Sequence, residues 1–346
     1  MRHSFAWFAL LLLVAPLGSA RAAGEDDPFR DDGSIRYRFY TGGELLYLRR
    51  SGGDDVPITQ NIRCCTLPLV TEELTSNDAV NGDWKFGGRG YFGARLDAVS
   101  SVEVTYLGIG YSGDETAAAP AFETLNAFEL PDAMTFPDGS FDDAAYHQIK
   151  YDAMLHSGEL SYRRRLEVDG VDYHFNLLAG LRALRFEEDL GLDSWDSDTD
   201  PLPASEFGHY DVSARNTLIG AQVGADAFVP LWAERLDLDI YFAVGGYANE
   251  ANVYSSYVDG NTGTNIRQSD NEWKASGVLE AAAQLQFRLW RGVRMNLGYR
   301  AVYLINVASG PGNFAESGGN DDFFDSYDAG SEVLFHGASV GFGVDF

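Results

Sequence analysis

The chain has 346 residues, of which 45% are hydrophobic and 13% aromatic, and 52 acidic side chains outnumber 25 basic ones to give a formal charge of −27. Such an acidic chain repels phosphate backbones, which excludes nucleic-acid binding driven by counterion release. The apolar and aromatic content excludes a disordered chain, because this much apolar surface must be buried or must face lipid.

The first 22 residues are typical of a cleaved export signal. Arg2 and His3 form a short positive region, Phe5 to Val14 form an apolar run, and Ala20-Arg21-Ala22 is a small-residue cleavage site. We expect cleavage after Ala22, which would leave 23 basic and 52 acidic side chains and a charge of −29. The sequence therefore predicts a protein that leaves the cytoplasm.

The remaining sequence narrows the fold class. No later segment contains eighteen consecutive apolar residues, which excludes an α-helical membrane protein. A secreted soluble domain rich in β-structure and a membrane β-barrel are the classes left. We assign residues 23–35 to an N-terminal periplasmic segment and residues 36–346 to one outer-membrane barrel domain.

Long runs of alternating apolar and polar residues favour the barrel. In the segment 84–96, Trp84 begins an apolar face and Lys85 begins a polar one, and the segments 216–229 and 274–288 repeat the pattern. Runs of twelve or more alternating residues exceed the usual soluble strand of about five or six, and they suit tilted strands that cross a bilayer and project beyond it. The ten predicted strands are 36–49, 84–96, 101–111, 148–164, 171–187, 212–229, 236–250, 273–288, 293–307 and 333–346.

The predicted strands are joined alternately by long and short connections. The short links are 97–100, 165–170, 230–235 and 289–292, and the long ones are 50–83, 112–147, 188–211, 251–272 and 308–332. The five long connections, counted with residues 187 and 250 included, hold 33 acidic and 3 basic side chains. This sorting predicts an all-β, single antiparallel transmembrane β-barrel of about ten strands, with long acidic external loops and short periplasmic turns. Twelve strands is the alternative, with the extra pair inside 50–83 or 112–147.

The polar faces of the predicted strands carry charges of both signs. On a lipid face each charge would cost several kcal/mol, so the polar face is expected to point into the lumen. The lumen-facing candidates are Lys85, Arg89, Arg95, Glu103, Asp172, His174, Arg182, Gln222, Asp226, Lys274, Glu280, Arg288, Arg294 and Arg300.

The C-terminus ends on a terminal aromatic residue preceded by alternating apolar ones. Val340, Phe342, Val344 and Phe346 share one face of the final strand. This ending resembles the signal that the barrel-assembly machinery reads on bacterial outer-membrane proteins. The alternative interpretation is an ordinary edge strand of a soluble β protein.

Four short segments carry a resemblance to a known family. They are Gly43-Glu-Leu-Leu-Tyr-Leu48, Leu67-Pro-Leu-Val-Thr71, Asn216 to Ala225 and Phe335 to Phe342. They resemble the legionella-type pore-forming outer-membrane proteins and their relatives. The resemblance implies an outer-membrane β-barrel in a Gram-negative-type envelope, with porin function and with outer-membrane lipid and the barrel-assembly machinery as partners.

Other residue groups suggest additional chemistry. The loop carboxylates Asp193, Asp196, Asp198 and Asp200 would suit weak calcium binding, although acidic loops are more often merely solvated. The adjacent pair Cys64-Cys65 would form a strained vicinal disulfide, pair between chains or lie passively in a loop. We expect no cofactor.

The function expected from the sequence is passive diffusion through the barrel, with a preference for cations set by the acidic loops. The first alternative is a non-conducting surface barrel that displays its acidic loops for adhesion or envelope organisation. A second alternative is an omptin-like protease, in which His147 or His209 beside an aspartate activates water. No nucleophile motif is present, and we expect the chain not to be an enzyme.

Overall fold

The computed structural model describes residues 37–346 except 53–55, 64–69, 81–83, 120–122, 128–140, 142–143, 167–173, 196–206, 233–234, 291, 317–326 and 328–329. The predicted signal sequence, the segment 23–35 and the pair Cys64-Cys65 lie outside these residues. No helix in the described part of the chain has the length and apolar composition needed to cross a lipid bilayer.

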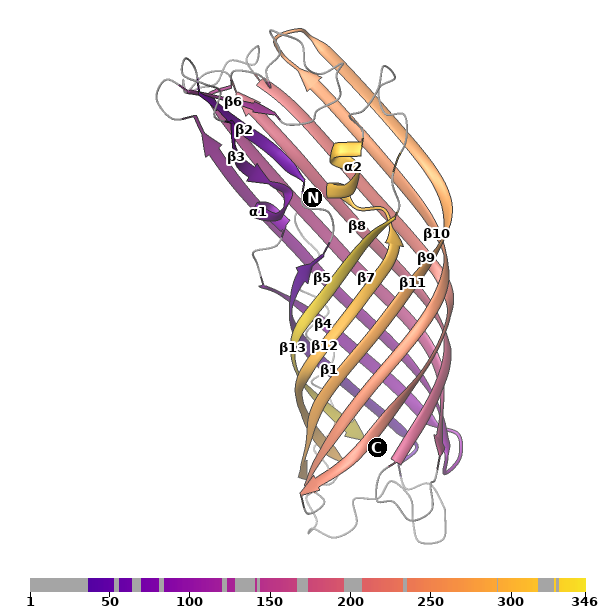
Figure 1. Cartoon of the computed structure of the whole chain (residues 1–346). Helices are drawn as coiled ribbons and strands as arrows, with labels where there is room; N and C mark the ends of the chain where they lie inside the picture. The colour runs from indigo at the N-terminus through magenta and orange to yellow at the C-terminus, as the bar shows by residue number, and fades with distance from the viewer. Residues whose placement is uncertain are drawn as a thin grey trace.

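Ten antiparallel strands form a closed barrel (Figure 1). The strands are β1 (Phe39–Ser51), β4 (Trp84–Arg95), β5 (Ser100–Ala118), β7 (Tyr146–Leu166), β8 (His174–Trp195), β9 (Phe207–Trp232), β10 (Leu236–Asp259), β11 (Thr264–Trp290), β12 (Val293–Val307) and β13 (Ser331–Asp345). Each barrel strand pairs with the barrel strand that follows it in the sequence. The last strand, β13, closes the ring by pairing with β1, from Tyr40↔Asp345 to Ser51↔Leu334. The prediction of ten strands is confirmed.

Three further strands lie inside the first two long connections. They are β2 (Pro57–Arg63), β3 (Val70–Thr75) and β6 (Glu123–Ala127), and they form a separate sheet in the order β3-β2-β6. The helix α1 (Ser76–Val80) follows β3 and lies against the upper part of β5. The twelve-strand alternative is therefore wrong, because these strands do not join the barrel wall.

The barrel wall is much taller on one side than on the other. Strands β1, β4, β12 and β13 have 12 to 15 residues, whereas β5 and β7 to β11 have 19 to 27. The tall side rises beyond the closed ring at the end away from the short turns, as Figure 1 shows. We call the part of these longer strands that rises beyond the closed ring the tall wall. It includes much of the predicted long connections 188–211 and 251–272, which are therefore largely strand.

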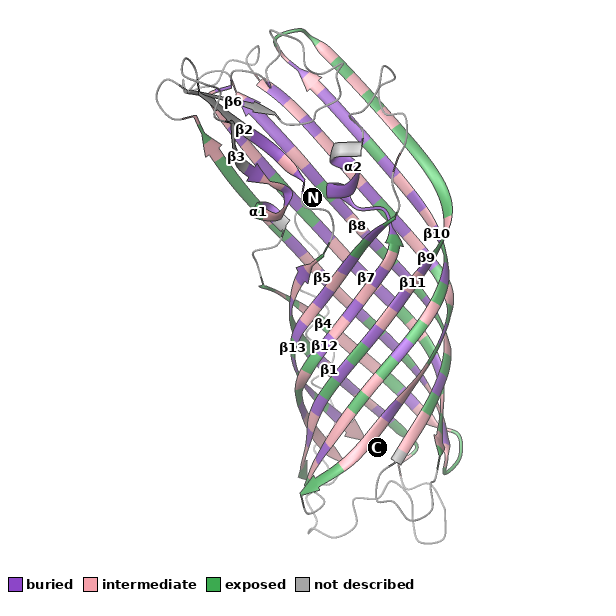
Figure 2. Cartoon of the chain, viewed as in Figure 1, coloured by how far each residue is buried: buried purple, intermediate pink, exposed green. Residues whose placement is uncertain are grey.

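Where the tall wall begins, the outer face of the strands changes from apolar to polar and the inner face changes from polar to apolar. On β8, Leu177 and Leu181 are 50% and 64% exposed on the outside, but Arg185 and Asp189 occupy the same outer face farther along the strand. The inner face changes in the opposite sense, to buried residues such as Phe186. The alternation of buried and more exposed residues therefore continues along β8 as far as Leu192 (Figure 2), which is why this segment is strand although its outer face is polar.

The inside of the tall wall holds a core of buried apolar side chains. Phe186 meets Phe335 with ring centroids 5.8 Å apart, and Tyr210 meets Phe314 at 4.7 Å. Phe314 belongs to α2 (Gly310–Glu316), a short helix that packs against β8 and β9. The core is thus shared between the barrel wall and segments folded into the barrel.

A left-handed residue sends the chain inward at the end of β12. Asn306 has a φ of 57°, and the pairing of β12 with β13 shifts register at this point. The Asn216 side chain then holds the chain, because its amide donates to the Ala308 carbonyl at 2.7 Å and its carbonyl accepts from the Ala308 amide at 2.8 Å. As a result, β11 pairs with β12 only from Gly277 onward, and Thr264 to Ser276 have a single neighbouring strand among the residues that the structure describes.

Candidate functional site

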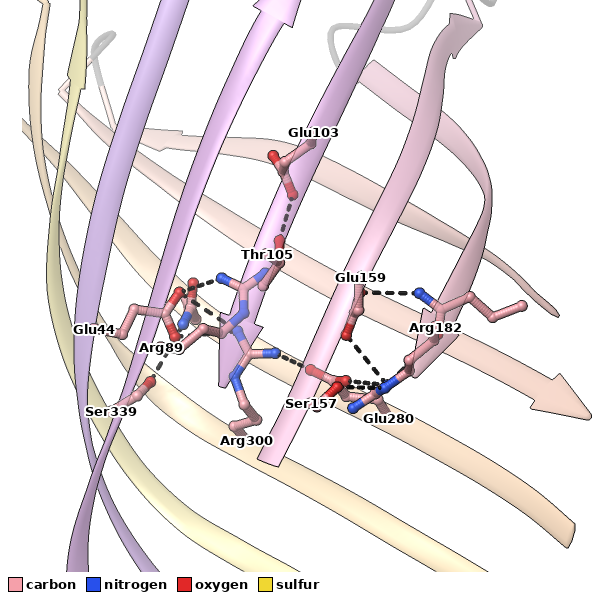
Figure 3. A network of polar contacts seen from close by, with 12 residues as sticks. Glu44, Arg89, Glu103, Thr105, Ser157, Glu159, Arg182, Glu280, Arg300 and Ser339 are labelled. Carbon is pink, nitrogen blue, oxygen red and sulfur yellow. Dashed lines mark hydrogen bonds and ion pairs between the residues drawn. The ribbon is translucent and has the colours of Figure 1, made fainter. Parts of the chain in front are cut away.

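The lower lumen is crossed by a connected set of buried ion pairs (Figure 3). Glu44 of β1 pairs with Arg89 of β4 at 3.0 Å and with Arg300 of β12 at 3.1 Å. Arg300 also pairs with Glu280 of β11, which accepts a second bond from Arg182 of β8 at 2.8 Å. We call these five residues the ion-pair belt. It links strands on opposite sides of the ring, and removing one member would leave buried charge uncompensated.

A second group of ion pairs lies closer to the short-turn end. Arg163 of β7 pairs with Glu103 at 2.9 Å and with Asp226, which also accepts from the Asn176 amide. The remaining pairs line the turn end of the wall: Arg95 and Arg294 both approach Asp345, at 2.9 and 3.6 Å, and Arg288 pairs with Asp237 at 2.8 Å. Charges of both signs therefore neutralise each other along the lumen.

An apolar cluster fills the lumen next to the ion-pair belt. Nine of the ten barrel strands contribute a side chain to it that is at most 3% exposed: Leu46, Leu107, Leu155, Leu184, Leu218, Ala251, Val278, Val302 and Phe335. Side chains this inaccessible leave no room for water between them. Within the part of the chain that the structure describes, the lumen is closed at this level.

A polar cavity of about 200 Å³ lies between the ion-pair belt and the short turns. Its lining includes Tyr40, Arg163, Asp239, Asn296 and Arg300, and it reaches the turn residues 97–100. The cavity is therefore accessible from the turn end of the barrel.

The structure places most of the predicted lumen residues on the inner face. Those on the inner face of the closed ring are Lys85, Arg89, Arg95, Glu103, Arg182, Gln222, Asp226, Glu280, Arg288, Arg294 and Arg300. Lys274 lies instead on the part of β11 above the closed ring, where it pairs with Glu272 at 3.2 Å. Asp172 and the His174 side chain lie outside the described residues.

Sequence reasoning missed several charged partners in the lumen. Glu44 and Arg163 belong to the two ion-pair groups, and Glu159 pairs with Arg182 of the ion-pair belt at 3.3 Å. Asp239 and Asn296 line the cavity. The signal was present in part, because Glu159 and Arg163 share the parity of buried Ser157 and Ser161 on β7. The run of three arginines at 163–165 obscured which of them faces inward.

The two rim histidines are both engaged by neighbours. His209 contacts Asp193 through Nδ1 and Asp211 through Nε2, at 3.0 Å for the latter, on the outer face of the tall wall. The hydrogen bond that His209 donates to the Asp193 carboxylate is the main cause that raises the pKa of His209 to about 9. His147 contacts the Thr59 hydroxyl at 2.9 Å, and burial lowers the pKa of His147 to about 3. Neither ring therefore has the arrangement of a general base beside a water-filled cleft.

The calcium site expected from loop carboxylates finds no support in the described residues. Asp193 was expected outside the strands, but it lies near the end of β8, where Lys150 donates to its carboxylate at 2.6 Å. The described residues contain no group of three or more His, Cys, Asp or Glu side chains that could hold a metal ion. Asp196, Asp198 and Asp200 lie outside the described residues.

The C-terminal apolar face points outward. Val340, Phe342 and Phe346 are 39%, 54% and 54% exposed, whereas the alternate residues of β13 face the lumen. The Phe346 backbone exchanges two hydrogen bonds of 2.9 Å with Phe39, so the final residue seals the ring at the start of β1.

Comparison with known proteins gives a similarity of architecture alone. No family model matches the chain, and no curated protein matches it. Among solved structures, the outer membrane protease OmpT from Escherichia coli is 10% identical with a TM-score of 0.46, covering 89% of this chain and 97% of that one. The P. putida toluene transporter TodX is 6% identical with a TM-score of 0.27, covering 90% and 91%. A Pseudomonas aeruginosa FadL homologue is 10% identical with a TM-score of 0.27, over 90% and 91%. These similarities carry no information about activity or transported solute.

Proposed function

We propose that this chain is a non-conducting outer-membrane β-barrel that holds its tall wall outside the cell as a rigid acidic surface for adhesion or envelope organisation. In this proposal the short turns face the periplasm and the tall wall faces the exterior. The proposal includes the absence of catalysis, because both rim histidines are occupied by their neighbours.

The outer face of the closed ring supports insertion in a membrane. Large apolar side chains that are more than half exposed include Leu45, Phe86, Leu181, Ile219, Val223 and Phe342. A belt of this kind is unfavourable in water and suits lipid. Trp232 and Trp290 are 71% and 65% exposed at the short-turn end, and Trp273 is 66% exposed toward the other end, as expected of aromatic girdles at two interfaces.

The apolar cluster across the lumen carries the proposal that the barrel does not conduct. Ions need a continuous path of water or polar ligands, and buried aliphatic side chains provide neither. Ten strands also enclose a narrow space, since barrels of about eight strands are filled by their side chains. The passive, cation-favouring channel expected from the sequence is the competing proposal, and it would require the apolar cluster and α2 to move.

Single-channel recording separates the two proposals. Refolded protein, with folding shown by circular dichroism and by heat-dependent migration on a gel, is added to planar lipid bilayers at low and high salt. We expect no conductance steps. A matched variant in which Leu46, Leu184 and Val302 are replaced by Ser should fold with lower stability and admit water, and it serves as the control for detection. Reproducible steps from the unaltered protein would refute the proposal, and cation selectivity of those steps would support the channel.

A further inference from the structure

One acidic side chain of the lower lumen stands apart from the others. Asp239 of β10 lines the polar cavity, and it has no ion-pair partner within 4 Å among the described residues. Its Oδ1 atom is buried and has no hydrogen-bond partner in the described part of the chain. The other described acids on this part of the inner face are each paired with an arginine: Glu44, Glu103, Glu159, Asp226, Asp237, Glu280 and Asp345.

A second unpartnered acceptor faces the same cavity. Asn296 of β12 is 4% exposed, and no described residue forms a hydrogen bond with its Oδ1 atom. The register places Asp239 opposite Gln284 and Asn296 opposite Gln286, with β11 between them. Neighbouring strands lie about 4.8 Å apart and a strand rises about 3.3 Å per residue, so the two backbone positions, two strands and two residues apart, are separated by about 12 Å. A ligand of a few atoms that lies between the two inward-facing side chains can reach both.

The chemistry of these two atoms restricts what they can bind. A carboxylate only accepts hydrogen bonds, and an amide oxygen does the same. An uncompensated buried charge in a membrane-spanning barrel is costly and marks a functional site when it is retained. A matching ligand must therefore be positive and must donate hydrogen bonds. Six arginines line the same cavity beside five acidic residues, which disfavours a doubly charged ion: Arg89, Arg95, Arg163, Arg165, Arg294 and Arg300.

We propose that the cavity binds a small primary ammonium compound that enters from the short-turn side. The ammonium group donates to the Asp239 carboxylate and to the Asn296 amide oxygen, and it supplies the positive charge that Asp239 lacks. The volume of about 200 Å³ exceeds the share of one water molecule, about 30 Å³, and leaves room for a short carbon chain. This site lies below the apolar cluster, so it needs no conduction through the barrel.

Thermal unfolding and calorimetry test the site on the refolded full-length protein in detergent. The probe is propylammonium chloride, and the comparison salts are tetramethylammonium chloride, which lacks N–H donors, and KCl at equal ionic strength. We expect binding of propylammonium alone. Asp239→Asn should lower the affinity about tenfold or more, since a hydrogen bond to a charged group is lost, and Asn296→Leu should lower it less.

Asp237→Asn is the matched control, because Asp237 lies two residues away on the same face and is paired with Arg288. A paired residue stabilises the fold, so this variant should melt at a lower temperature and still bind propylammonium. Asp239→Asn should melt at or above the temperature of the unaltered protein, because it removes a charge without a partner. A lower melting temperature for Asp239→Asn together with unchanged binding would overturn the proposal. Equal binding of tetramethylammonium or potassium would also overturn it.

Discussion

Replacing Arg50 should test how strongly the tall wall is held together. Arg50 and Glu188 are 1% and 0% exposed in the apolar core, and Arg50 reaches Glu188 Oε1 through Nε at 2.8 Å and through Nη2 at 2.7 Å. Glu188 Oε2 also accepts from the Gly310 amide at 3.0 Å, so the same carboxylate holds the start of α2. Arg50→Met leaves Glu188 charged and buried without a cation, which should cost about 3 to 5 kcal/mol.

The double variant decides whether this reasoning is right. Replacing both partners by apolar residues of similar size is often neutral, so Arg50→Met with Glu188→Met should recover most of the lost stability. Urea unfolding of the refolded protein gives the free energies, and hydrogen exchange at the Gly310 amide reports the local opening of α2. The reasoning would be refuted if Arg50→Met lowered the free energy of unfolding by less than about 1 kcal/mol. It would also be refuted if the double variant lost as much free energy of unfolding as the two single variants together.

Three further predictions concern the rim, the assembly signal and the orientation. The pKa of His209 is raised from 6.5 to about 9, so its stabilising effect is complete below pH 6.5 and is lost as the pH rises through 9. Hydrogen-exchange protection factors in the tall wall, which correct for the base-catalysed intrinsic rate, should therefore fall over this range, but not in His209→Asn. Phe346→Ser should lower the amount of protein in the outer membrane, measured by blotting of membrane fractions, and an unchanged amount would contradict a role in assembly. In a protein with Cys64 and Cys65 replaced by Ser, an impermeant maleimide added to intact cells should label Thr262→Cys and spare Ala98→Cys, and the reverse pattern would invert the orientation.

The strands were predictable from the sequence because one simple period governs them. Alternation with an apolar outer face identified all ten barrel strands, but it underestimated β8 and β10, which extend to Trp195 and Asp259. The apolar residues change to the inner face in the tall wall, so an apolar outer face is the wrong signal there. Following the parity of Phe186 into Leu190 and Leu192 would have extended β8 correctly.

The partners within the lumen could not be predicted in the same way. Glu44 and Arg300 are 256 positions apart in the chain, and their contact depends on the ring closing with one particular register. Alternation assigns a side chain to the inner face but does not say which charges face each other across it. The unpaired Asp239 was not identifiable either, because its lack of a partner is a property of the whole ring.

The free edge of β11 has a consequence for how this protein behaves beside its own copies. Within the described chain, the thirteen residues from Thr264 to Ser276 have a strand on one side only, and a strand edge of this kind is a template onto which another strand can add. Four charged side chains, Arg267, Asp270, Glu272 and Lys274, are distributed along this stretch. Adding a strand would bring like charges together in many registers and would remove these side chains from water. These charged side chains therefore disfavour strand pairing between the β11 edges of neighbouring copies of the barrel.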